Sequence, residues 1–193
     1  TFPLLYDRLT GTLVGEIKKS ARDGGSWALV EPETDRIWSG PNADNALQSF
    51  NRTTGAHTAT VKGANSLVVD GQYAFYNTDS SLVKVHIDPS GSKIDRLGNK
   101  AVRSESKVVW SRDAAFPFSL IKTGTLIFAG GAGRVAAFEG DGEQVWEAPV
   151  DGRAFGLAAA SGCLYVSTDT GSIHCFKATL PRLILPSLDP RVG

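Results

Sequence analysis

Residues 118–176 read FSLIKTGTLIFAGGAGRVAAFEGDGEQVWEAPVDGRAFGLAAASGCLYVSTDTGSIHCF, and the same pattern occurs in them twice. Short runs of apolar or alternating residues are separated by turns that are rich in glycine and aspartate. Turns of this composition between short apolar runs are typical of antiparallel strands joined as hairpins. This stretch therefore predicts a succession of short strands.

The first copy of the pattern contains four predicted strands, and the second contains three. Those of the first copy are Phe118–Ile121, Thr125–Ala129, Arg134–Phe138 and a run that ends at Trp146. Those of the second copy begin at Phe155, Cys163 and Ile173. A unit of four strands that recurs about every forty residues is the sequence signature of a propeller blade.

Four similar turns lie along the chain, and in each a polar side chain opens the turn and a glycine closes it. Asp and Asn side chains bond to the backbone two residues on, and glycine tolerates the left-handed conformation at the exit. We interpret these turns as the links between the third and fourth strands of successive blades. They are Asp7–Gly11, Asn51–Gly55, Asp88–Gly91 and Glu139–Gly142.

The predicted fold is all-β: a β-propeller of four-stranded antiparallel blades, of which about four to five are visible. A partial blade covers residues 1–20, further blades cover about 25–63, 64–112, 117–152 and 154–178, and a tail covers 179–193. In the second full blade we expect the outer strand within 93–110, with the polar stretch 95–107 as an excursion between this outer edge and the next inner strand. Both ends lack strands, so we expect part of a propeller of about six to eight blades, cut at both ends or completed by another chain. The other possibility is a small, distorted propeller that closes alone.

Composition excludes some partners. Lys plus Arg equal Asp plus Glu, 20 against 20, so the zero net charge makes nucleic acid an unlikely partner. No apolar run approaches the ~20 residues that span a bilayer, and no signal peptide is visible. Cys163 and Cys175 fall diagonally on one face of a predicted hairpin, where they are either buried thiols or a disulfide.

The repeat resembles the pyrroloquinoline-quinone (PQQ) propeller repeat of quinoprotein alcohol dehydrogenase-like proteins. In that motif an alanine is followed by an acidic residue, a glycine and a tryptophan, and Ala137, Glu139, Gly142 and Trp146 match it with a turn one residue shorter. The resemblance covers most of residues 5–177. It implies that Trp146 docks one blade on its neighbour and does no chemistry.

Members of the resembled superfamily are either dehydrogenases, which hold PQQ and Ca²⁺ in a central channel, or binding scaffolds without a cofactor. The alcohol-type dehydrogenases carry adjacent cysteines, and this sequence has no such pair. We therefore expect a non-catalytic scaffold for a protein or a ligand, with no cofactor and no metal site. The alternative is a fragment of a PQQ-dependent oxidoreductase. The resemblance also favours a periplasmic or other extracytoplasmic location.

Charged residues recur where the chain enters three of the predicted inner strands. They are Arg22 with Asp23, Arg112 with Asp113, and Asp151 with Arg153. An aromatic-x-Leu pattern follows each, beginning at Trp27, Phe118 and Phe155. One reading is ordinary solvated ion pairs between blades. The other is a charged channel mouth that binds a small polar ligand or a partner loop, in which case Arg22, Arg112 and Arg153 should face one funnel.

Overall fold

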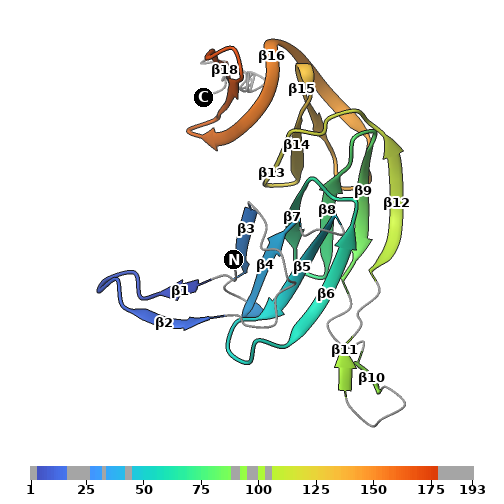
Figure 1. Ribbon diagram of the computed structural model, residues 1–193. Helices are drawn as coiled ribbons and strands as arrows, with labels where there is room; N and C mark the ends of the chain where they lie inside the picture. Colours follow the sequence, from blue (N-terminus) through green and yellow to red (C-terminus); the bar gives the residue numbers. More distant parts are fainter. Residues whose placement is uncertain are drawn as a thin grey trace, which may run out of the picture.

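A computed structural model describes residues 4–16, 27–31, 34–41, 45–87, 92–94, 100–102 and 106–177. Apart from isolated turns, the secondary structure of these residues consists of β-strands. Every strand pair is antiparallel. Two four-stranded sheets and one six-stranded sheet follow one another along an arc, with the last strands at one end and the N-terminal hairpin at the other (Figure 1). The all-β prediction is confirmed.

The first four-stranded sheet has its strands in sequence order. It contains β3 (Trp27–Glu31), β4 (Arg36–Gly40), β5 (Ala46–Asn51) and β6 (His57–Lys62). The turn at Asn51–Gly55 links the third strand to the fourth, as its composition predicted. Gly55 adopts φ 67°, the left-handed conformation that glycine tolerates without strain.

The second sheet contains β7 (Ser66–Asp70), β8 (Tyr73–Asn77), β9 (Ser81–His86) and β12 (Lys107–Asp113). Between β9 and β12 the chain forms a separate pair, β10 (Ser92–Ile94) and β11 (Lys100–Val102). The polar excursion therefore precedes the outer strand, and its predicted position after that strand is wrong. The reason is the ladder of β12 on β9, which runs from Lys107 opposite His86 to Asp113 opposite Ser81.

The third sheet merges with the last strands. It contains β13 (Ser119–Thr123), β14 (Leu126–Gly130), β15 (Ala132–Phe138) and β16 (Gln144–Ala160), followed by β17 (Cys163–Thr168) and β18 (Ile173–Lys177). The first half of β16 pairs with β15 and its second half pairs with β17. One strand therefore serves as the outer strand of one blade and the inner strand of the next. The predicted loop at 151–153 lies within this strand.

Three apolar cores fill the spaces between successive sheets. Side chains alternate between the two faces of a strand, so neighbouring residues enter different cores: Ala74 packs toward the first sheet and Phe75 toward the third. The first core surrounds Trp38, which is fully buried. The third core, around Val135 and Val166, joins the third sheet to β17. Each sheet thus depends on its neighbour for burial.

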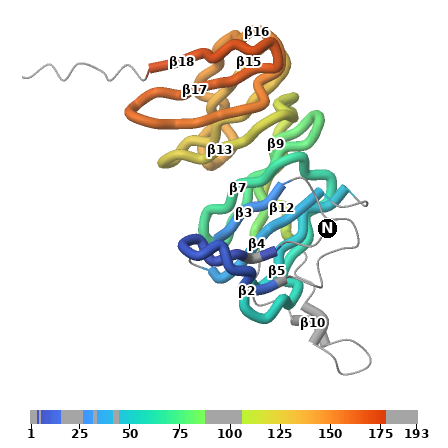
Figure 2. The backbone as a smooth tube through the Cα atoms, turned by 60° about the vertical axis from the view of Figure 1, so that its left-hand side comes forward, coloured from blue at the N-terminus to red at the C-terminus, as the bar shows by residue number. Residues whose placement is uncertain are grey.

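The N-terminal hairpin stands apart from these cores. Strands β1 (Leu4–Tyr6) and β2 (Leu13–Glu16) pair only with each other among the described residues. The hairpin extends away from the first full sheet in Figure 1, and in Figure 2, where that side comes forward, it lies in front of the sheet. Its exposed side chains include Leu4, Tyr6 and Leu9.

Candidate functional site

The bend of β16 is held by the turn between β17 and β18. The backbone N–H of Arg153 donates to Oδ1 of Asp169 at 2.6 Å, and Nε of Arg153 donates to Oδ2 at 2.7 Å. These bonds lower the pKa of the Asp169 carboxyl, the backbone bond most. The sequence grouped Arg153 with Asp151 in one loop, whereas in the structure Arg153 pairs with Asp169 and joins the bend of β16 to a turn of the same sheet.

Asp151 is the second anchor of this bend. Its carboxylate accepts hydrogen bonds from the hydroxyls of Ser172, at 2.6 Å, and Thr170, at 2.8 Å, and contacts Nε2 of His174. These three donors hold the pKa of Asp151 well below its usual range, with Ser172 contributing most. The carboxylate therefore stays ionised and fixes the start of β18 against β16.

Two phenyl rings meet beside this anchored bend. The ring centroids of Phe118 and Phe155 lie 4.8 Å apart. The guanidinium carbon of Arg153 lies 5.3 Å from the centroid of Phe155 and 5.9 Å from that of Phe118. Phe155 is 49% exposed, a large fraction for a phenylalanine. The aromatic-x-Leu pattern identified both rings in the sequence. Their contact depends on the tertiary structure, because it forms where adjacent blades meet.

The same contact recurs in the second sheet with different residues. Nδ2 of Asn65, just before β7, donates to Oδ1 of Asp79 at 3.0 Å in the turn between β8 and β9. In the last sheet Asp169 occupies the position equivalent to Asp79, whereas Arg153 lies two residues before Phe155, the equivalent of Asn65. The entry to an inner strand and the following turn are therefore bridged in two blades, and we interpret the bridge as a structural part of the repeat.

The other predicted site residues lie elsewhere. Arg22 and Asp23 fall outside the described residues. Arg112 and Asp113 lie on β12, an outer strand, and their predicted position in a loop before an inner strand is wrong. Nη2 of Arg112 donates to the carbonyl of Asp141 at 3.3 Å, and its guanidinium lies 5.6 Å from the Trp110 ring. Arg153 pairs instead with Asp169 and lies over the two phenyl rings, so the two arginines have no contact partner in common.

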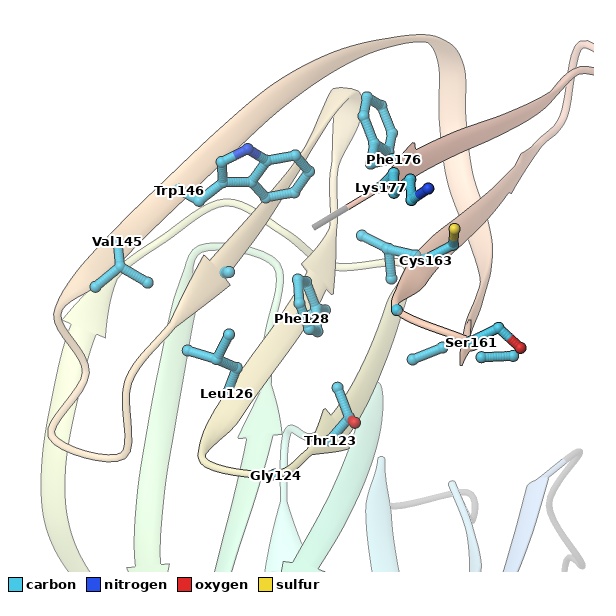
Figure 3. A pocket seen from close by; sticks show the side chains of 15 residues that line it. Thr123, Gly124, Leu126, Phe128, Val145, Trp146, Ser161, Cys163, Phe176 and Lys177 are labelled. Carbon is cyan, nitrogen blue, oxygen red and sulfur yellow. The ribbon is translucent and has the colours of Figure 1, made fainter. Parts of the chain in front are cut away.

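A groove that the sequence did not predict lies between the third sheet and the last strands (Figure 3). Its volume is about 740 Å³, and its walls include Leu126, Phe128, Val145, Trp146 and Phe176. Val145 is 46% exposed. The strand pattern alone could not indicate the groove, because each wall residue also has the spacing of a core residue.

Trp110 and Trp146 occupy equivalent positions on the outer strands of two blades. The Trp110 ring lies 5.9 Å from Phe75 of its own sheet, and the Trp146 ring lies 6.3 Å from Phe128. Trp146 also contacts Phe176 of the last sheet at 5.3 Å. It thus lies at a blade junction, as the motif implied, although it remains half-buried.

The two cysteines are free. Cys163 is half-buried, but Cys175 is exposed, so the expectation of two buried thiols is wrong for Cys175. Within the described ranges no group of three or more His, Cys, Asp or Glu side chains is arranged to hold a metal ion. No helix in that part of the chain has the length and apolar character needed to cross a membrane.

Comparisons with known proteins decide the fold. BamB from Moraxella catarrhalis matches with a TM-score of 0.61 and 15% identity, over 90% of this chain and 52% of that one. The β-propeller domain of Myceliophteria thermophila Cps50 (Swd1) matches with a TM-score of 0.65 and 13% identity, over 98% of this chain and 62% of that one. The chain is a partial β-propeller.

The matched structures differ in how much of their own length this chain covers. This propeller spans less than two thirds of BamB and of the Cps50 domain, whereas it covers 95% of the computationally designed Ika4 protein, with a TM-score of 0.60 and 12% identity. No family model and no curated protein sequence matches the chain. At these identities the likeness establishes the fold alone.

Proposed function

We propose that this partial propeller is a non-catalytic scaffold that binds a protein partner where Phe118, Phe155 and Arg153 meet. The observation that carries the proposal is the half-exposed Phe155 ring, packed against Phe118 and covered on one side by a guanidinium. Aromatic and arginine side chains dominate the energetics of protein interfaces. Because Asp169 neutralises Arg153, the surface suits an apolar side chain ringed by polar groups better than a strongly charged ligand.

The backbone under this cluster is fixed before any partner arrives. Asp151 and Asp169 tie the bend of β16 to the turn between β17 and β18. A surface that needs no ordering on binding loses less conformational entropy and binds more tightly for the same contacts. Two matched propellers come from complexes: the mitotic checkpoint complex, and a BBS1 fragment with ARL6.

A charge placed on Phe155 tests the proposal. Phe155→Asp should remove most of the proteins that the tagged wild-type chain captures from a cell extract, measured by quantitative mass spectrometry. Tyr73→Asp is the matched control, since Tyr73 is a similarly exposed ring on β8 of another blade. Equal capture by the wild type and both variants would reject this face as the contact surface.

We also propose that the scaffold needs no cofactor, with PQQ and Ca²⁺ as the alternative. The proposal is supported by two observations: the described residues form no acidic or histidine cluster for Ca²⁺, and the sequence has no adjacent cysteines. Reconstitution with PQQ and Ca²⁺ should produce no quinone absorption band and no reduction of an artificial dye. Turnover of the dye with an alcohol or sugar would establish the oxidoreductase instead.

A further inference from the structure

The N-terminal hairpin has the structure of half a blade. Oδ1 of Asp7 accepts from the N–H of Leu9 and Thr10 at 3.0 and 2.8 Å, and the N–H of Asp7 donates to Thr12. Asn51 makes the same pattern: its Oδ1 accepts from the N–H of Thr54 at 2.7 Å, and its own N–H donates to Ala56. Since Asn51 links the third and fourth strands of the first full sheet, β1 and β2 correspond to a third and a fourth strand, and no inner pair accompanies them among the described residues.

This half blade needs a covering surface. An isolated two-stranded hairpin is marginally stable in water at best. The hairpin nevertheless carries large apolar side chains that are about half exposed or more: Leu4, Tyr6, Leu9, Leu13 and Val14. A contiguous set of exposed apolar groups on a paired strand marks an interaction surface.

The opposite end of the arc lacks the kind of strand that the hairpin contains. The second half of β16, β17 and β18 are an inner, a second and a third strand, and β18 has no partner on its far side among the described residues. The N–H of Thr168 donates to the Ser172 carbonyl, so these two residues form a hydrogen-bonded pair of the ladder. Hydrogen-bonded and non-hydrogen-bonded pairs alternate from there along β17 and β18. The N–H groups of Ile173 and Cys175 therefore point to the free edge.

The groove beside β18 lies at the junction between the third blade and the last strands. The corresponding space at the preceding junction, between the second and third blades, is filled. There, the turn at Gly140–Gly142 approaches the outer strand of the second blade, and the Gly140 carbonyl accepts from the indole of Trp110 at 3.2 Å and from Lys84 at 3.0 Å. At the next junction the equivalent tryptophan, Trp146, lines the groove. The structural repeat therefore indicates that a turn followed by a fourth strand belongs in this space.

We propose that two copies of this chain exchange their N-terminal hairpins, so that β2 of each copy adds to the free edge of β18 in the other and the hairpin side chains cover its groove. The hairpin and the groove lie at opposite ends of the arc, so a reciprocal exchange closes both junctions. The chain spans 52% of BamB and 45% of the designed Ika8 chain, so a propeller of either length contains more strands than those described here. The sequence after β18 is a poorer occupant, because prolines 181, 186 and 190 interrupt it and proline donates no ladder bond.

Sedimentation equilibrium of the purified chain should give a mass twice the 20.5 kDa of one copy. Ile173→Pro removes an edge N–H without touching the β17 ladder, and it should give a monomer, whereas Ile173→Val should remain dimeric. Val145→Lys places a charge in the groove at a half-exposed position and should also give a monomer. This variant tests the proposal independently if the proline variant fails to fold. Circular dichroism confirms that each variant is folded.

A mixing experiment tests the exchange itself. Val14→Pro disables the hairpin and leaves the three cores intact, so this variant alone should be monomeric. Mixed in equal amounts, Val14→Pro and Ile173→Pro share one intact junction and should form a heterodimer of weaker affinity. A monomeric wild type at all concentrations, dimers that survive both proline substitutions, or a mixture that stays monomeric would each overturn the proposal. Phe155→Asp should remain dimeric, so failure here and failure of the partner-binding face are distinguishable.

Discussion

The side chains of Arg153 and Asp169 join the bend of the longest strand to the final turn, with 2.7 Å between Nε and Oδ2. Together with the Asp151 contacts, this pair fixes the last sheet relative to the sheet before it. Both carboxylates have a lowered pKa in the folded protein, so acid should reduce the stability of the fold.

Thermal stability should fall as the pH drops below about 4, the usual pKa range of an aspartate, partly because Asp151 takes up a proton in the unfolded chain while it is still ionised in the folded protein. A pKa that is lower in the folded state stabilises the fold above the unfolded value and loses that contribution as the pH falls through the folded one. Asp151→Asn should therefore lower the melting temperature at neutral pH and converge with the wild type in acid. Asp113→Asn removes a surface charge at a distance from this turn and is the control. Parallel pH profiles for Asp151→Asn and the wild type would contradict the prediction.

Gly130→Ala should destabilise the protein by about 1–3 kcal/mol, the usual effect of overpacking. A Cβ at Gly130 would overlap the carbonyl oxygen of Ala154 and Oγ of Ser119, where Ser119 donates to Ala154 at 2.7 Å between the blades. Gly140→Ala adds the same methyl group where there is free space, and it should change stability by less than about 0.5 kcal/mol. Urea unfolding measures both, and equal midpoints would show that the contact is not tight.

Asn77→Ala should cost about 1–3 kcal/mol, because it leaves buried partners unsatisfied. Nδ2 of Asn77 donates to the Phe116 carbonyl at 2.7 Å, and its Oδ1 accepts from the N–H and hydroxyl of Ser66. Asn65→Ala breaks only a surface bond to Asp79 and should have a smaller effect. Chemical denaturation distinguishes the two, and the reverse order would mean that water replaces Asn77 at no cost.

Ile127→Ala should lower the free energy of unfolding by about 2–5 kcal/mol, because it opens a cavity in the core between the second and third sheets. Val109→Ala trims a branched side chain on β12 that is 50% exposed, and it should cost less than about 0.5 kcal/mol. Similar losses at both positions would contradict the assignment of Ile127 to the core.

Much of the fold could be predicted from local patterns. The turns at Asn51 and Glu139 lie between third and fourth strands, and the turn at Asp7 joins two paired strands, because the Asx bond and the closing glycine act within about five residues. The equivalence of Trp110 and Trp146 also followed from the spacing of the repeat.

The candidate site was less predictable. The sequence placed Arg112 before an inner strand, but the ladder of β12 on β9 extends as far as Asp113 and makes Arg112 part of an outer strand. The contact of Phe118 with Phe155 joins a residue just before β13 to a residue of β16, and no spacing rule specifies it. The groove depends on how the side chains of the third sheet and of the last strands pack against each other, and a list of strands does not reveal this.

The sequence by itself determined that the chain forms short antiparallel strands grouped in fours, because hairpin turns and side-chain alternation are local and strong signals. Only the tertiary structure decided that β16 serves two blades, that the excursion precedes β12, and that the Arg153 cluster and the groove exist. These features depend on pairing between strands and on packing between sheets, which are set by contacts between residues that lie far apart in the chain.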